Sequence, residues 1–144
     1  MNIESIFKLF PTQKDCVKYI ERVRWGNKPV CPYCHSLCCS AMQKEIEYEI
    51  NRYHCNKCNT AFSVLVGTIF QNSKLELQKW LFMIFLAMDI KKSMSSRQLA
   101  DCLGINHKTA WSIQAKIRRA LCQSDAEFLK KLTTNIGYKH EIME

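Results

Sequence analysis

The chain has 144 residues, nine cysteines and a formal net charge of +8. A chain of this length forms one domain or two small ones, without a large hydrophobic core. Its N-terminus lacks the apolar stretch of a signal peptide, so we expect a cytoplasmic protein, nucleoid-associated if bacterial, with reduced cysteines. The longest apolar run, at 80–88, is about half of what crosses a bilayer, which argues against a membrane protein.

The positive charge is concentrated in one part of the chain. Residues 71–123 contain nine Lys or Arg against three Asp or Glu, which accounts for most of the net charge. A basic segment of this kind is typical of a surface that binds a polyanion. On charge alone, a solvated basic face explains it equally well.

The N-terminal segment, residues 1–27, predicts a helical lead-in. Thr12 and Asp15 have the spacing of a capping box, in which each side chain accepts a hydrogen bond from the other residue's backbone amide. Apolar residues follow at helical spacing from Cys16 to Val23. A helix should therefore begin just after Thr12.

Two Cys-x2-Cys pairs follow, Cys31 with Cys34 and Cys55 with Cys58, separated by twenty residues. Each pair presents two thiolates from one tight turn, and two facing turns complete a tetrahedral site for one structural zinc ion. Four protein thiolates leave no open position on the metal, so this zinc would fasten the fold and would not activate water.

Two segments predict strands of the same module. Residues 45–54 alternate Ile46, Tyr48 and Ile50 with acidic residues, as in a half-exposed strand. Residues 61–70 are rich in β-branched and aromatic side chains. The order of knuckle, strand, knuckle and strand predicts a zinc ribbon over residues 28–70.

The other cysteines and the histidines beside the ligands are expected to lie outside the metal site. Cys38 is predicted to pack, and Cys39 to pack or lie on the surface, with ligand substitution by either as the minor alternative. His35 and His54 could compete for metal, but exposed loop histidines explain them better. Three further cysteines fall on helical apolar patterns that predict core packing: Cys16, Cys102 and Cys122.

Two more capping patterns mark helices in the basic segment. Ser73 and Glu76 precede an apolar helix that should run to residue 89 and be buried. Ser95 and Gln98 precede a short helix that should run to residue 103.

Residues 95–121 predict a helix-turn-helix. Ala100 is small enough for two crossing helices to touch, and Gly104 permits a left-handed turn residue. Ile105 would plug the turn into the core, and Asn106 would cap the second helix. An ordinary helical hairpin, in which Gly104 is only a C-cap, is the alternative.

The second helix should bury one stripe and expose the opposite one. The predicted buried stripe is Ala110, Ile113, Ile117 and Leu121. The predicted exposed stripe is Lys108, Ser112, Ala115 and Arg119. Trp111 is expected to pack against another helix. The expected DNA contacts are Asn106, His107, Lys108, Thr109, Ser112, Arg118 and Arg119. Arg118 and Arg119 also suit the negative end of the helix dipole, which is the alternative for both.

The expected fold is a small α+β protein, a zinc-ribbon β module followed by an all-α helix-turn-helix module. The lead-in covers residues 1–27, the ribbon 28–70 and the helix-turn-helix domain 71–123. Ser124 and Glu127 have capping-box spacing, so residues 124–144 predict a short helical tail.

Four stretches of the chain, taken together, resemble a known family: CPYC, YHCNKC, AFSVLVGTIFQNSKLELQKWLFMIFL and SSRQLADCLGINHKTAWSIQAKIR. They are similar to the N-terminal half of insertion-sequence transposases of the bacterial group related to eukaryotic Merlin elements. The resemblance covers about residues 6–121. It implies a zinc ribbon and a DNA-binding helix-turn-helix, which in that family precede an RNase H-like catalytic domain.

The resemblance stops before that catalytic domain. In such a domain three carboxylates gather two divalent metals, and they are spread over well over a hundred residues. Only residues 122–144 follow the match here, so we expect no strand-transfer activity. The acidic residues of this tail are not expected to form the catalytic set: Asp125, Glu127, Glu141 and Glu144.

Three functions are compatible with these patterns. The first is a zinc-dependent, non-enzymatic module that binds double-stranded DNA at transposon ends. It would work alone, as a homodimer or with a separately encoded catalytic transposase subunit. The second is a transcription regulator with the same two modules. The third is a protein-interaction module that uses the ribbon and the apolar helix at 75–89.

Overall fold

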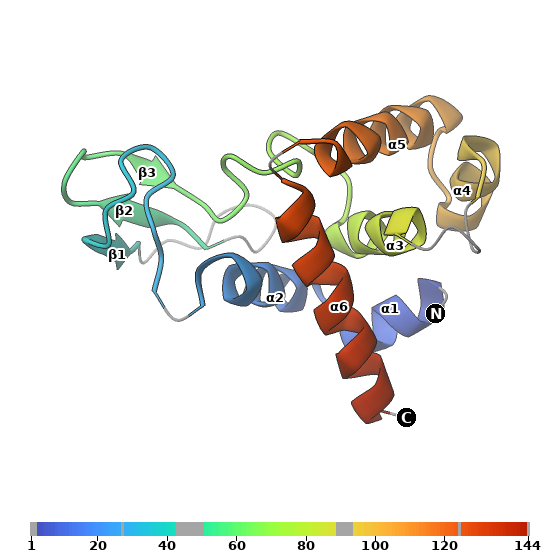
Figure 1. The fold of residues 1–144 in the computed structure, drawn as a ribbon, viewed down its shortest axis with the longest axis horizontal. Coiled ribbons are helices and arrows are strands. Elements are labelled where there is room, and N and C mark those ends of the chain that lie inside the picture. Colours follow the sequence, from blue (N-terminus) through green and yellow to red (C-terminus); the bar gives the residue numbers. More distant parts are fainter. Residues whose placement is uncertain (1–2, 27, 43–50, 89–93, 124, 144) are drawn as a thin grey trace. The chain divides into compact units, whose positions relative to one another are not determined.

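The computed structural model of the chain describes residues 3–26, 28–42, 51–88, 94–123 and 125–143 (Figure 1). The chain divides into two compact units. We call residues 12–74 the ribbon unit, and residues 1–11 with 75–144 the helical unit. The α+β fold class is confirmed, because a small antiparallel sheet is followed by helices.

The boundary between the units falls inside the predicted lead-in. Helix α1 (Ile3–Leu9) belongs to the helical unit, whereas helix α2 (Gln13–Trp25) belongs to the ribbon unit. Phe10, just after α1, is fully buried, and its carbonyl accepts a hydrogen bond from the Gln78 side chain at 3.3 Å. Residues 1–27 thus contribute one helix to each unit. The division of the chain into four domains stays a prediction.

Helix α2 begins at the predicted capping box. Thr12 Oγ1 accepts from the Asp15 amide at 3.2 Å, and Asp15 Oδ2 accepts from the Thr12 amide at 3.1 Å. These two bonds satisfy amides that have no partner within the helix. Cys16 and Ile20 are fully buried, as their helical spacing predicts.

The ribbon unit contains a three-stranded antiparallel sheet. Its strands, in spatial order, are β1 (Cys39–Ala41), β2 (Tyr53–Cys55) and β3 (Ala61–Phe62). Cys39 lies opposite Cys55, and Tyr53 lies opposite Phe62. Of the strand predicted at 45–54, β2 covers the end. Residues 43–50, with Ile46, Tyr48 and Ile50, lie outside the described residues.

The strand predicted at 61–70 is wrong beyond Phe62. The chain turns instead, since the Thr68 amide donates to the Leu65 carbonyl at 3.1 Å. Gly67 has a φ of +80°, which an extended strand does not use. Leu65 and Phe70 are nevertheless buried. The apolar residues of this segment therefore reach the core through successive turns, so their β propensity did not decide the backbone.

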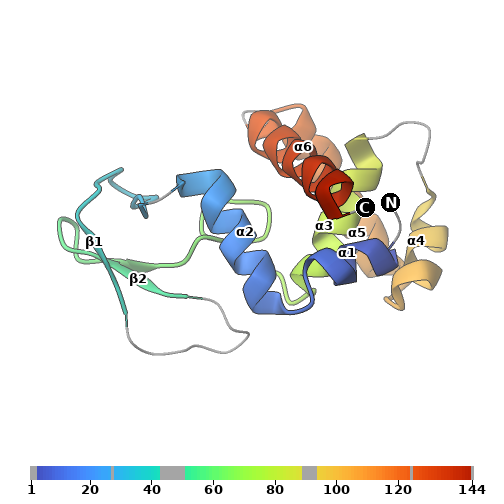
Figure 2. The same cartoon turned by 90° about the horizontal axis from the view of Figure 1, so that it is seen from below.

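The helical unit is built around α3 (Leu77–Met88). The other helices of its second part are α4 (Ser96–Leu103), α5 (His107–Leu121) and α6 (Ala126–Met143). Helix α3 contacts α1, α5 and α6, and α4 packs on α5 (Figures 1 and 2). Trp80, Leu81 and Ile84 are fully buried, which confirms the predicted buried helix. Among the described residues, no helix has both the length and the hydrophobicity to cross a membrane.

The boundaries of α3 and α6 differ from the predicted caps. Helix α3 begins at Leu77, four residues after Ser73, and the Glu76 carbonyl accepts from the Trp80 amide at 3.2 Å. It ends at Met88, and residue 89 lies outside the described residues. Ser124, the predicted cap of the tail helix, also lies outside them.

A three-residue turn, residues 104–106, joins α4 to α5. Gly104 has φ +66° and ψ +34°, the left-handed conformation predicted for it. The backbone amides of Gly104 and Ile105 both donate to the Ala100 carbonyl. Asn106 Oδ1 accepts from the Lys108 amide at 2.8 Å and so caps α5. The predicted capping box at Ser95 is also present at the start of α4.

Gly104→Ala should destabilise the helical unit by about 1 kcal/mol, because a Cβ disfavours the left-handed conformation. Apart from Gly104 and its immediate neighbours in the chain, nothing lies within 4 Å of the place that a Cβ would occupy, so the cost is conformational and not a clash. Gly104→Asn is the matched control and should lose less, since Asn tolerates this conformation better. Urea unfolding followed by circular dichroism measures both. If the alanine variant is as stable as the wild type, the turn does not require glycine at position 104.

Candidate metal centre and nucleic-acid interface

The two Cys-x2-Cys pairs meet in the ribbon unit. Their four sulfur atoms lie within 4.8 Å of one another. Two distances join the pairs, with Cys31 Sγ 3.6 Å from Cys58 Sγ and Cys34 Sγ 3.5 Å from Cys55 Sγ. A tetrahedron with Zn–S bonds of about 2.3 Å has S–S edges of about 3.8 Å. The four cysteines therefore suit one structural zinc ion.

The two knuckles have the same backbone geometry. The His35 amide donates to the Cys31 carbonyl at 2.9 Å, and the Asn59 amide donates to the Cys55 carbonyl at 2.9 Å. His35 has φ +60° and Asn59 has φ +57°. Asn and His are among the non-glycine residues that adopt the left-handed region most readily. His35 therefore closes its knuckle as Asn59 closes the other.

Backbone amides of the second knuckle favour a thiolate at Cys55. The Cys58 amide lies 3.5 Å from Cys55 Sγ and lowers the pKa of Cys55 to about 6. A hydrogen bond from the Ser36 backbone amide acts to lower the pKa of Cys34. Burial and the neighbouring cysteines outweigh it and raise that pKa to about 12. A zinc ion that binds all four thiolates must displace protons from the cluster, so its affinity falls as the pH is lowered.

An aromatic cluster supports the metal site from the side of α2. Trp25 meets Tyr53 edge-on at 5.4 Å between ring centroids, and it meets Phe62 edge-on at 5.8 Å. Tyr53 and Phe62 stack across β2 and β3 at 5.9 Å. Phe62 in turn packs with the buried ligands Cys31 and Cys55. The ligands are thus held by ring contacts as well as by their own turns.

Two side chains of α2 fasten it to the rest of the ribbon unit. Tyr53 Oη donates to Glu21 Oε1 at 2.9 Å, and burial together with Glu21 raises the pKa of Tyr53 to about 12. Arg24 Nη1 donates to the Val64 carbonyl at 2.6 Å. This role of α2 was not predicted from the sequence. The spacing of Glu21, Arg24 and Trp25 on one helical face is the signal that could have indicated it.

Cys38 and Cys39 differ from each other in environment. Cys38 is exposed, so its predicted packing is wrong, and Cys39 is half-buried against the Cys31 and Cys55 cluster. Burial raises the pKa of the Cys39 thiol, and the neighbouring Cys55 adds to the effect. Neither residue is among the four that gather in the described part of the chain. His54 lies in β2 and is half-buried, so its expected place in an exposed loop is also wrong.

Of the three cysteines predicted to pack on helices, Cys16 alone is buried. Cys102 in α4 and Cys122 after α5 are exposed. In α4 the buried residues are Leu99, Ala100 and Leu103, and Cys102 falls off that face. The helical spacing of apolar residues therefore predicted burial wrongly at both positions.

Helix α5, the second helix of the predicted helix-turn-helix, presents one face to solvent. Ala110, Ile113 and Ile117 are buried as predicted, with Ala120 in addition, whereas Leu121 is half-buried. All the predicted DNA contacts are exposed: Asn106, His107, Lys108, Thr109, Ser112, Arg118 and Arg119. His107 Nε2 lies 2.9 Å from Ser96 Oγ and so links α5 to the first residue of α4. Their contact with DNA stays a prediction.

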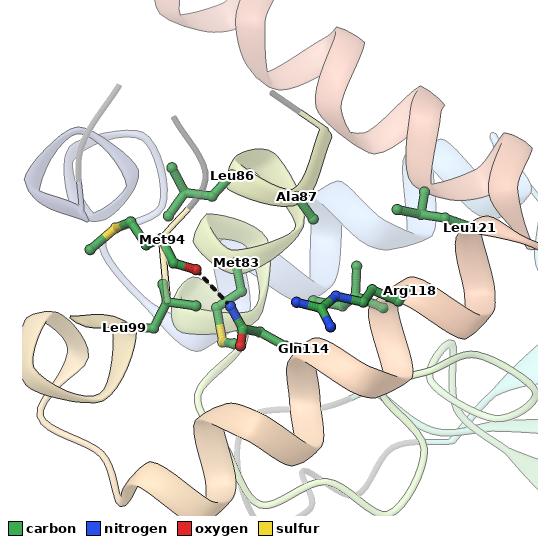
Figure 3. A pocket seen from close by; sticks show the side chains of 9 residues that line it. Met83, Leu86, Ala87, Met94, Leu99, Gln114, Arg118 and Leu121 are labelled. Atoms are coloured by element: carbon green, nitrogen blue, oxygen red, sulfur yellow. Dashed lines mark hydrogen bonds between the residues drawn. The ribbon is translucent and has the colours of Figure 1, made fainter. Parts of the chain in front are cut away.

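Arg118 and Arg119 point to different surroundings. Arg118 lines a mostly apolar cavity of about 150 Å³ between α3, α5 and the residues before α4. Figure 3 shows its guanidinium reaching over that cavity toward Gln114, whose side-chain amide donates to the Met94 carbonyl at 3.0 Å. Arg119 Nε donates to the Ala115 carbonyl at 3.5 Å, so this side chain runs along the exposed face. Arg119 is therefore better placed for a phosphate than Arg118.

Trp111 does not pack as predicted. The Trp111 side chain is 63% exposed. It lies on the same side of α5 as Lys108, one turn earlier, and Ala115, one turn later. The interior beside α5 is formed by the buried stripe and by α3 and α4. The described residues thus leave this indole in contact with solvent.

Cys55→Ser should abolish stoichiometric zinc binding and unfold the ribbon unit. It removes a fully buried ligand whose thiolate the second knuckle stabilises, and structural zinc supplies on the order of 10 kcal/mol to modules of this size. Metal analysis of the purified protein and limited proteolysis of residues 12–74 measure the two effects.

Cys38→Ser is the matched control for that experiment. Cys38 is exposed and lies outside the four-cysteine cluster, so this variant should keep one zinc per chain and the wild-type proteolysis pattern. Full zinc stoichiometry in Cys55→Ser, or loss of zinc in Cys38→Ser, would show that the ligand assignment is wrong.

Comparison with known proteins agrees with this geometry. Residues 11–61 match the transposase zinc-ribbon domain. A protein of the transposable element ISH50 from Halobacterium salinarum is 27% identical over 115 residues, which cover 79% of this chain and 37% of that relative. The chain thus spans little more than a third of the length of this relative. No solved structure matches the chain.

The domain match begins with α2 and includes both knuckles and the start of β3. It therefore falls almost entirely within the ribbon unit, residues 12–74, in which α2 is fastened to the sheet. Helix α2 thus lies within the residues that match the domain, and it also packs with the sheet of that domain. On these findings, residues 11–61 form a zinc ribbon similar to the transposase zinc-ribbon domain, and most of the chain is similar to a protein of a transposable element.

Proposed function

We propose that this protein is a zinc-dependent DNA-binding protein of transposition, which recognises duplex DNA at transposon ends through α5. The observation that carries the proposal is the exposed face of α5, in a chain that also has a transposase-type zinc ribbon. This helix has 15 residues, none of them acidic, and its cations are Lys108, Lys116, Arg118 and Arg119. The assignment to the Merlin-related group of bacterial elements is part of this proposal.

The placement of side chains on α5 supports a recognition helix. A helix-turn-helix puts the N-terminal part of its second helix into the major groove. In α5 that part carries His107, Lys108 and Ser112, all exposed. Arg119 lies further along the same face and suits a phosphate of the flanking backbone. Among the described residues, Lys108, Lys116 and Arg119 have no acidic partner, so their charge is available to DNA.

The ribbon unit supplies a second basic surface in this proposal. Lys14, Lys18 and Arg22 are exposed on α2 at intervals of four residues, which places them along one side of the helix. We assign them to sequence-independent phosphate contacts that extend the DNA site. The zinc cluster would act indirectly, because it folds the unit that presents α2.

The proposal assigns strand transfer to a catalytic subunit encoded separately, with which this chain would share transposon ends. A homodimer would let two copies of α5 bind two half-sites of an end sequence.

Selection of bound duplexes from a randomised DNA pool tests the function. The zinc-loaded chain should enrich a consensus sequence that survives an increase in salt, since base contacts remain when phosphate contacts weaken. A consensus that occurs at element ends supports transposition, whereas one at promoters would indicate a transcription regulator. Binding without a consensus that disappears steeply with salt would overturn specific recognition and favour a protein-interaction module.

Lys108→Ala should weaken binding to the selected duplex by about tenfold and should relax the sequence preference at one or two positions. Lys131→Ala is the matched control. It removes the same charge from an exposed position on α6, outside the helix-turn-helix, and should have little effect. Titration by fluorescence anisotropy on the selected and on scrambled duplexes measures both. An equal loss on every duplex would make Lys108 a phosphate contact.

A further inference from the structure

Among the side chains of the helical unit that the structure describes, Trp111 is the large apolar one most open to solvent. It is 63% exposed, compared with 37% for Phe7. A single exposed apolar residue is ordinary on a protein surface and needs no function. The position of this one is less ordinary, because it lies on the second helix of a helix-turn-helix, on the face that carries the predicted DNA contacts.

The residues around Trp111 suit a partner that has negative charges and also apolar groups. Lys108 lies one turn before Trp111, and Arg119 lies two turns after it. Ser112 and Ala115 are small, so the middle of the helix leaves room for a close partner beside the indole. An acidic residue is absent from the whole of α5, residues 107–121.

The same charges argue against a second copy of the chain as the partner of this face. Two copies that met through α5 would bring Lys108, Lys116 and Arg119 of one chain toward the same cations of the other. Like charges that face each other across an interface cost free energy. A partner with regularly spaced negative charge and apolar groups between them fits better, and the major groove of DNA offers both.

We infer that Trp111 is a specificity residue of α5, whose indole contacts thymine methyl groups in the major groove. The inference rests on the proposed function and adds to it the base type that this position reads. The C5-methyl of thymine is the apolar feature of the major groove, and apolar side chains are known to read it. The indole of Trp111 is then covered by DNA in the complex, and its exposure in the free protein is what leaves it available.

Substitution of Trp111 tests the inference first at the level of affinity. Trp111→Ala should weaken binding to the selected duplex by about tenfold and leave the dependence on salt unchanged, since an apolar contact releases no counterions. Arg119→Ala should instead lower the slope of log K against log salt by about one. Circular dichroism should show both variants folded, because both positions are exposed. Trp111→Phe should keep part of the affinity.

Uracil substitution tests the contact itself, because it removes the methyl group of thymine and keeps its hydrogen bonds. At one or two thymines of the selected site, uracil should weaken wild-type binding by about fourfold, the value of one buried methyl. The same substitutions should not affect Trp111→Ala. Loss of the uracil effect in this variant, together with its retention in Arg119→Ala, would establish the contact.

The outcomes separate this inference from the proposed function. A wild-type chain that selects no consensus overturns both. A consensus that Trp111→Ala binds as tightly as the wild type, or uracil effects of equal size in both proteins, overturns the thymine contact and leaves DNA recognition standing. If Trp111→Ala changes the sedimentation of the free protein from a dimer to a monomer and leaves DNA affinity unchanged, the face is a self-association surface and the inference is wrong.

Discussion

The ribbon unit depends on four cysteine sulfurs that lie within 4.8 Å of one another. Its strands have three, three and two residues, and pairs of strands this short are not stable alone in water. The buried cluster at its centre is Cys31, Cys55 and Phe62, so two of three members are proposed zinc ligands. The metal site therefore shares two of its cysteines with this cluster, and a bound zinc ion supplies cohesion that strands this short lack.

Helix α2 packs against the sheet and the metal site and so enlarges the ribbon unit. Trp25 covers Tyr53 and Phe62, while Glu21 and Arg24 bond to Tyr53 and to the Val64 carbonyl. These contacts tie both sides of the second knuckle to a helix that also carries the exposed Lys14 and Lys18. Loss of zinc would thus affect the basic surface of α2 as well as the knuckles, which links metal binding to the proposed DNA contacts.

The helical unit depends on burial of one stripe of α5. Ala110, Ile113 and Ile117 hold the helix in the unit, where α3 and α4 pack against it. Because this stripe faces inward, the opposite stripe must face solvent, and it carries cations and an indole without any acid. Gly104 fixes the angle at which α5 leaves α4. Its left-handed conformation lets the Ala100 carbonyl accept hydrogen bonds from two backbone amides at the end of α4. The orientation of the exposed face therefore follows from packing on the hidden one.

The sequence by itself determined the features that a few neighbouring residues control. The capping boxes at Thr12 and Ser95, the left-handed Gly104 and the meeting of the two Cys-x2-Cys pairs all follow from local chemistry. The tertiary structure decided what depends on which faces meet. It turned residues 63–70 away from a strand, put α1 and α2 in different units, and left Cys102, Cys122 and Trp111 exposed. A helical pattern predicts which side chains share a face of the helix. Whether that face is buried depends on whether another element packs against it, and only the tertiary structure decides this.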